Sequence, residues 1–141
     1  MESLWSHSDE ADLVKEYEKQ GVTGDVALRV YSARLLGKVR QLVLHGGGNV
    51  SVKTKMSNVL GKEEDFICVK GSGWGMEYIE PPGLPAVRLN PIQELSDLKS
   101  LSDEDMVNVQ RSNLLDSGSP NPSVETLLHA FLPHKFVDHT H

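Results

Sequence analysis

Two histidines close to the end of the sequence, His139 and His141, are separated by a single residue. If this segment is a β-strand, side chains at positions i and i+2 project from the same face, and the two imidazoles lie side by side. Imidazole nitrogens are common ligands of zinc, so the pair supplies half of a zinc site. Two ordinary strand histidines are the alternative interpretation.

Glu125 is the second candidate for chemistry, and it is expected in the first turn of a helix capped by Ser123. A carboxylate beside a metal-bound substrate can act as a general acid or base. The helix dipole also favours a carboxylate at this position, so a purely structural role stays open. His129 lies one helical turn later, where it can share a face with Glu125. Our interpretation of His129 is a packed or hydrogen-bonded core residue.

Two glycine-rich loops, 45–51 and 70–75, each adjoin a predicted strand. Glycine lets backbone N–H groups approach an anion closely, and Asn49 and Ser72 add side-chain hydrogen bonds. Neither loop matches the P-loop or the dinucleotide-binding fingerprint. The two loops together indicate a phosphate or oxyanion pocket, with a pair of tight turns as the alternative. Cys68, in the apolar segment before the second loop, is interpreted as a small core residue rather than a nucleophile.

Hydropathy patterns predict the elements that must position these residues. Helices are predicted at 9–20, 25–38, 102–115 and 124–132, and strands at 50–53, 66–69, 86–89 and 135–141. Helices come first, and strands and helices then alternate. The predicted fold class is therefore α/β with one sheet.

The composition fits one globular domain, with 141 residues of which 38% are hydrophobic. Lys and Arg number 14 against 20 Asp and Glu, a net charge of −6. This acidic balance argues against binding to nucleic acid and against attachment to an anionic membrane. The single cysteine cannot form an internal disulfide, and no apolar run approaches the roughly 20 residues that span a bilayer. With no signal peptide visible at the N-terminus, a cytoplasmic location is predicted.

Taken in order, these motifs resemble the class II aldolase/adducin family. The motifs are Gly48-Asn49-Val50-Ser51, Gly71-Ser72-Gly73, Pro122-Ser123-Val124-Glu125 and His139-Thr140-His141. The sequence resembles most the aldolase part of the bifunctional rhamnulose-1-phosphate aldolase/alcohol dehydrogenase branch. The segments that carry this resemblance are 44–49, 69–74, 83–89, 101–106 and 121–129. The resemblance extends from about Asp25 to His141.

The resemblance implies an α/β/α sandwich around a mixed, mainly antiparallel sheet, usually assembled as a C4 homo-tetramer. It implies that His139 and His141 are two of three histidine ligands of Zn²⁺, and that Glu125 is the acid/base carboxylate. The residues implied in the pocket for the phosphate of the sugar substrate are Gly48, Asn49, Ser72, Gly73 and Ser123. The implied reaction is zinc-dependent cleavage of a ketose 1-phosphate to dihydroxyacetone phosphate and an aldehyde, which is L-lactaldehyde if the sugar is rhamnulose.

The sequence departs from the family pattern in three ways. The third zinc-binding histidine would lie beyond His141, so residues 1–141 are expected to be the N-terminal portion of an aldolase domain, weakly active or inactive alone. Val124 replaces a second serine of many relatives, and Gly75 replaces the aspartate usual in the bifunctional branch. In addition to these three departures, any dehydrogenase domain is expected to be missing from this chain.

Two alternatives stay open: a sugar-phosphate epimerase or dehydratase of the same fold, and a non-catalytic, adducin-like interaction module. The presence of both Glu125 and the histidine pair favours an enzyme.

Overall fold

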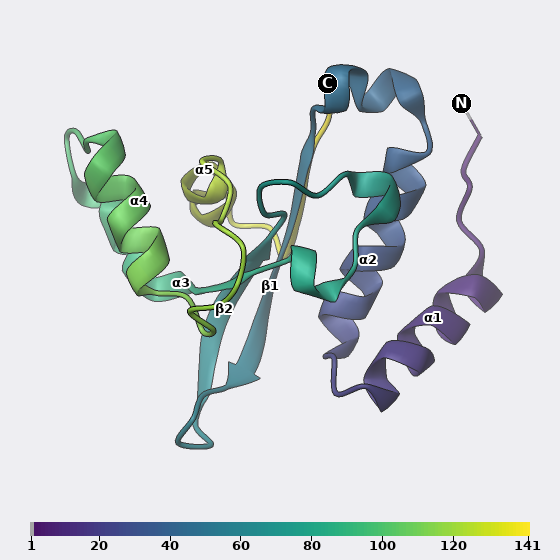
Figure 1. Ribbon diagram of the computed structural model, residues 1–141, viewed down its shortest axis with the longest axis horizontal. Coiled ribbons are helices and arrows are strands. Elements are labelled where there is room, and N and C mark those ends of the chain that lie inside the picture. Colours follow the sequence, from purple (N-terminus) through teal and green to yellow (C-terminus); the bar gives the residue numbers. More distant parts are fainter. Residues whose placement is uncertain (1) are drawn as a thin grey trace.

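The computed structural model describes residues 2–141 and has a four-stranded sheet between two helical layers (Figure 1). The strands are β1 (Asn49–Ser57), β2 (Glu63–Val69), β3 (Ala86–Arg88) and β4 (Phe136–His139). They are ordered β3-β2-β1-β4, and every neighbouring pair is antiparallel. The predicted α/β/α sandwich is confirmed, and the sheet, expected to be mixed, is antiparallel throughout the described chain.

One face of the sheet is covered by α1 (His7–Lys19) and α2 (Gly24–Gly37). Both helices begin at a capping side chain, because Ser6 and Thr23 each accept a hydrogen bond from a backbone N–H of the first turn. Helix α2 packs its buried Val30 against Val50 and Cys68 of the sheet. Helix α1 has no fully buried residue and lies outside α2, as Figure 1 shows.

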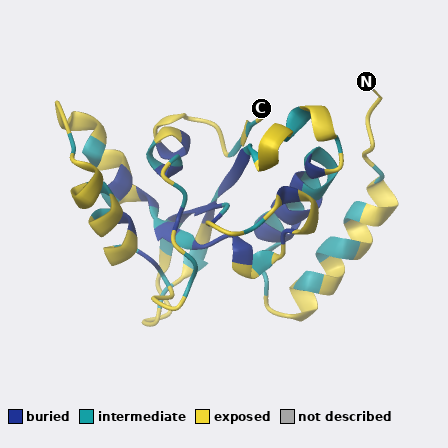
Figure 2. Ribbon diagram, turned by 45° about the horizontal axis from the view of Figure 1, so that its top comes forward, coloured by how far each residue is buried: buried dark blue, intermediate teal, exposed yellow. Residues whose placement is uncertain are grey.

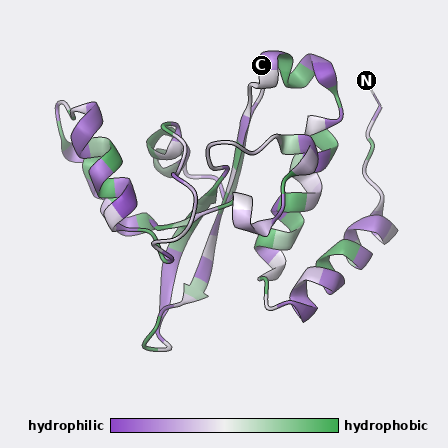
Figure 3. Ribbon diagram, viewed as in Figure 1, coloured by the Kyte–Doolittle hydropathy of each residue, from purple (hydrophilic) through white to green (hydrophobic). Residues whose placement is uncertain are grey.

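The opposite face is covered by α3 (Leu89–Glu94), α4 (Asp103–Ser112) and α5 (Thr126–Phe131). Strand residues alternate between the two faces, so Ile67 and Val87 point here while Cys68 points to α2. They pack with Ile92 of α3 and Ala130 of α5. Figure 2 shows the buried residues gathered along the sheet and the inner sides of the helices, and Figure 3 shows hydrophilic residues over much of α1 and α4.

Strand β4 carries His139, and helix α5 begins directly after Glu125. Two cationic side chains tie these elements to the rest of the fold. The buried guanidinium of Arg29 in α2 pairs with Asp138 at 2.6 Å. The ammonium of Lys53 in β1 donates to the carbonyls of His129, Leu132 and His134 at 2.9, 2.7 and 2.6 Å. Lys53 thereby satisfies one carbonyl in the last turn of α5 and two in the segment that follows the helix.

No helix among residues 2–141 combines the length and the apolar character needed to cross a bilayer.

Candidate active site

The pairing of β1 with β4 places the first glycine loop beside the histidine pair. Asn49 lies opposite His139 in the register. Gly48 has a φ of 94°, and a Cβ there would meet the His139 carbonyl oxygen at 3.0 Å, so this close approach requires glycine. Strand β4 ends at His139 rather than continuing to His141 as predicted. The backbone N–H of His141 instead donates to the carbonyl of Leu42 at 2.8 Å.

Glu125 contacts His139 directly, with 2.6 Å between Oε2 of the carboxylate and Nδ1 of the imidazole. Helix α5 begins at Thr126, so Glu125 occupies the N-cap position just before it, and its backbone N–H donates to Ser123 Oγ at 3.1 Å. An ionised carboxylate can only accept hydrogen bonds, so Nδ1 of His139 is the donor in this contact. An outer carboxylate commonly orients a metal-binding imidazole in this way.

The imidazoles of His139 and His141 lie edge to face, close enough together to reach one metal ion. Their ring centroids are 5.0 Å apart. Two ring nitrogens bound tetrahedrally to zinc at about 2.1 Å place the centroids about 5 Å apart. Within residues 2–141, however, no group of three or more His, Cys, Asp or Glu side chains is arranged to hold a metal ion. The donor set therefore fits zinc with two ligands and lacks a third.

A cavity of about 280 Å³ opens next to Glu125 and His141. Its size is close to the lower limit of small-ligand pockets, roughly 300 Å³. It is lined by Gly46, Gly47, Gly48, Asn49, Lys70, Gly71, Ser72, Ser123, Val124, Glu125 and His141. Of the predicted phosphate-pocket residues, Gly48, Asn49, Ser72 and Ser123 line this cavity, whereas Gly73 does not.

The polar side chains of this cavity are held by contacts within the protein. Asn49 donates through Nδ2 to Ser123 Oγ at 2.6 Å, and its Oδ1 accepts from the N–H of Val50 at 2.8 Å. The sequence analysis missed Lys70, whose Nζ donates to the carbonyl of Trp74 at 2.9 Å. Burial lowers the pKa of Lys70, and the charge of Glu125 opposes this effect. The signal in the sequence was a cationic residue directly before a glycine-rich loop.

His129 lies behind Glu125 and is completely buried. Its Nδ1 is 2.8 Å from the hydroxyl of Ser51 in β1, which confirms the prediction of a hydrogen-bonded core histidine. Burial lowers the pKa of His129, and Glu125 opposes this effect. Cys68 is buried as well, and desolvation raises the pKa of its thiol to about 12, as expected of a core residue rather than a nucleophile.

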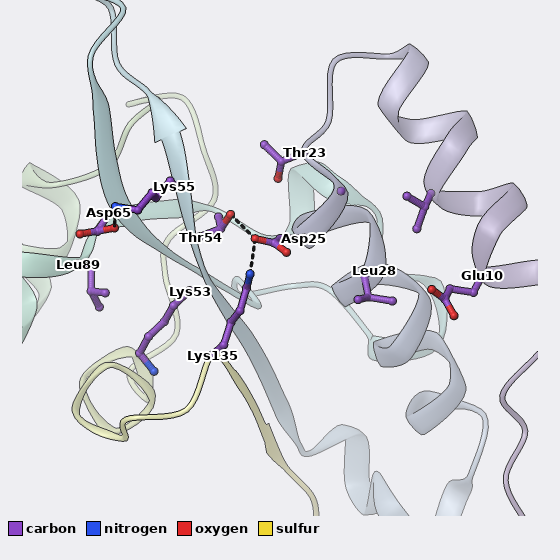
Figure 4. A pocket seen from close by; sticks show the side chains of 12 residues that line it. Glu10, Thr23, Asp25, Leu28, Lys53, Thr54, Lys55, Asp65, Leu89 and Lys135 are labelled. Carbon is purple, nitrogen blue, oxygen red and sulfur yellow. Dashed lines mark hydrogen bonds and ion pairs between the residues drawn. The ribbon is translucent and has the colours of Figure 1, made fainter. Parts of the chain in front are cut away.

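A second cavity, of about 690 Å³, lies between β1 and the start of α2 (Figure 4). Its charged groups largely satisfy one another. Asp25 accepts from Thr54 at 2.7 Å and pairs with Lys135 at 2.9 Å, and Lys55 pairs with Asp65 at 3.1 Å. This cavity shares no lining residue with the one at His141. Of the residues predicted to do chemistry, Glu125 and His141 line the smaller cavity, and His139 contacts Glu125.

Comparison with known proteins identifies the family. Residues 28–141 match the model of the class II aldolase and adducin N-terminal domain, and the chain belongs to this family. It is similar to the N-terminal class II aldolase domain of a conserved protein from Thermoplasma acidophilum, with a TM-score of 0.85 and 34% identity. That match covers 100% of this chain and 60% of the solved chain.

A curated relative is the uncharacterized oxidoreductase YuxG of Bacillus subtilis (strain 168), which is 37% identical over 138 residues. The match covers 98% of this chain and 19% of the relative, so the chain spans about a fifth of that protein's length.

Proposed function

We propose that this domain takes part in the zinc-dependent aldol cleavage of a ketose 1-phosphate, of the rhamnulose-1-phosphate type. The observation that supports this most directly is the contact of 2.6 Å between Glu125 and His139, beside His141 and a cavity that contains Lys70. A metal-binding histidine pair, an acid/base carboxylate and an anion pocket are the three parts that such a reaction needs.

In this proposal His139 and His141 hold Zn²⁺, and a third ligand comes from outside residues 2–141. Bound zinc would polarise the substrate carbonyl and stabilise the negative charge that develops as the C–C bond breaks. Cleavage between the third and fourth carbons removes the proton of the C4 hydroxyl and adds a proton to C3, giving dihydroxyacetone phosphate and an aldehyde. Glu125 is the proposed carrier of this proton: its carboxylate takes it from the C4 hydroxyl and gives it to C3.

The substrate phosphate is proposed to bind in the cavity of 280 Å³. The ammonium of Lys70 supplies positive charge, and the loop containing Gly48 supplies backbone N–H groups. Asn49 and Ser123 orient each other across this cavity. Gly73 does not line the cavity, and its contact with the phosphate through its backbone stays a prediction. We also propose that the protein works as a homo-oligomer in the cytoplasm.

The name of YuxG, an uncharacterized oxidoreductase, is in keeping with the bifunctional branch, in which a dehydrogenase accompanies the aldolase. An epimerase or dehydratase would use the same metal and pocket but give a different product. An adducin-like interaction module would need neither the metal nor Glu125.

The test is an assay of L-rhamnulose 1-phosphate cleavage, with and without zinc. It is carried out on this chain and on the full-length product of its gene, with release of dihydroxyacetone phosphate as the readout. We expect zinc-dependent release that Glu125→Gln abolishes. An isomerised or dehydrated sugar phosphate would identify an epimerase or dehydratase instead. Absence of both zinc binding and turnover in every version would favour the interaction module.

A further inference from the structure

Ser51 and His129 form a buried pair directly behind Glu125. Ser51 belongs to the Gly-Asn-Val-Ser motif, yet its side chain points away from the cavity lining and contacts Nδ1 of His129 at 2.8 Å. On the other side of the ring, Nε2 of His129 is buried with no hydrogen-bond partner and lies 3.5 Å from Oε2 of Glu125. Buried polar atoms are nearly always hydrogen-bonded, so this orphaned nitrogen needs an explanation.

The position of the proton on the His129 ring follows from its two neighbours. Burial lowers the pKa of His129, so one ring nitrogen carries a proton and the other accepts. If Nδ1 carried the proton, the lone pair of Nε2 would face the negative oxygen of Glu125, which is repulsive. If Ser51 donates to Nδ1, Nε2 carries the proton and faces the carboxylate favourably. The geometry therefore favours the Nε2–H tautomer.

We propose that His129 is a positioning residue for Glu125, held by Ser51 in the tautomer that directs its N–H at Oε2. This oxygen then lies between two ring nitrogens, Nδ1 of His139 at 2.6 Å and Nε2 of His129 at 3.5 Å. The longer distance is beyond a normal hydrogen bond, and a movement of roughly 0.5 Å closes it. The second oxygen of Glu125 forms no hydrogen bond within residues 2–141 and is left for the substrate proton.

Both members of the pair are fixed by the fold. Ser51 lies in the middle of the sheet, where it faces Val69 of β2 and Val137 of β4 in the register. His129 is in α5, and the ammonium of Lys53 binds its carbonyl at 2.9 Å. A rigid support of this kind is what precise placement of a catalytic carboxylate requires.

The first test is the tautomer of His129, read from imidazole ¹⁵N chemical shifts of the metal-free chain. We expect a proton on Nε2 in the wild type. We expect Glu125→Gln to reduce the population of that tautomer, because the negative charge facing Nε2 is lost while the Ser51 hydroxyl can donate to or accept from Nδ1. A proton on Nδ1 in the wild type, or no change in Glu125→Gln, would overturn the proposal. This measurement needs no enzyme activity, so it stands even if the proposed function is wrong.

The second test rests on the proposed function and compares two amides at position 129 in the zinc-loaded enzyme. In His129→Gln the amide nitrogen takes the place of Nε2 and can still donate to Glu125. In His129→Asn the shorter amide reaches Ser51 but not Glu125. We expect kcat to fall about tenfold or more in His129→Asn, with KM nearly unchanged, and to be largely retained in His129→Gln.

Thermal unfolding of both variants separates positioning from folding. If His129→Gln and His129→Asn have similar melting temperatures and lose kcat equally, the result would contradict positioning by His129. An effect on KM alone would contradict it as well. If the wild type itself fails to cleave sugar phosphate, the proposed function fails, and the tautomer alone decides the role of the Ser51–His129 pair.

Discussion

The imidazole of His141 packs directly against the α-carbon of Gly47. A Cβ at position 47 would overlap the Nδ1, Cε1 and Cγ atoms of that ring. The backbone of Gly47 has φ −78° and is open to any residue, so it is the space for the ring that requires glycine here. Gly47 therefore defines one wall of the proposed metal site.

Replacing Gly47 with alanine should weaken zinc binding by about tenfold or more, because the methyl group displaces a proposed ligand. Titration with Zn²⁺, or with Co²⁺ followed by its visible absorption, measures this effect. Gly75→Ala is the matched control, since its φ is −82° and a Cβ there meets nothing within 4 Å. Equal affinity in both variants would show that His141 does not bind the metal in this position.

Variants of His139 and Glu125 should separate metal binding from proton transfer. His139→Ala is expected to lose zinc and activity together, since a ligand is removed. Glu125→Gln is expected to keep zinc and lose cleavage by about 10²- to 10⁴-fold, the usual contribution of a general acid or base. Metal content and release of dihydroxyacetone phosphate are measured on the same samples. Turnover retained by both variants would mean that the site is wrongly assigned.

Lys53→Met should destabilise the fold by about 1–3 kcal/mol, because three carbonyls in α5 and the segment after it lose their donor. Lys55→Met is the control two residues away on the same strand. Its ammonium pairs with Asp65 at the surface, with side chains 65% and 43% exposed, and such pairs contribute about 1 kcal/mol or less. Urea unfolding gives both values, and equal destabilisation would show that the contacts of Lys53 add nothing.

The stability of the metal-free chain should fall as the pH decreases below about 6.5, the ordinary pKa of histidine. Burial lowers the pKa of His129 in the folded state, so the unfolded chain takes up this proton first. The contribution is present above pH 6.5 and is lost as the pH falls towards the lower, folded-state pKa. His129→Gln should reduce this slope of unfolding free energy against pH. An unchanged slope in His129→Gln would show that burial of this ring does not couple folding to pH.

Cys68 should resist thiol reagents in the native chain, because it is buried and its pKa is raised to about 12. Labelling with a chromogenic disulfide at pH 8 should be slow in buffer and complete in urea. Rapid labelling of the folded chain would contradict the burial of this strand.

The outline of the fold could be predicted where hydropathy is periodic. The predicted helices at 9–20 and 25–38 match α1 and α2 within two residues. Strands β1 and β2 extend beyond the predicted 50–53 and 66–69, and their outer residues were missed because they are mostly polar and lack apolar alternation. Helix α3 was not predicted. Its Pro91 lies in the first turn, where a helix tolerates proline.

The residues of the candidate site could be picked out from sequence motifs, but their contacts could not. The glutamate and both histidines stand in recognisable motifs, and the structure brings Glu125 to His139. The contacts of Ser51 with His129 and of Gly47 with His141 join residues far apart in sequence. They depend on how β1, β4 and α5 pack together, which no local pattern reveals.

His139 lies on β4, which pairs with β1 only and forms one border of the described sheet. Border strands open locally at a lower free energy than central ones. A ligand that binds the closed form alone raises the free energy of that opening. Zinc bound by His139 and His141 would thus stabilise this strand against local opening. Slower hydrogen exchange of the β4 amides in the presence of zinc would report this stabilisation.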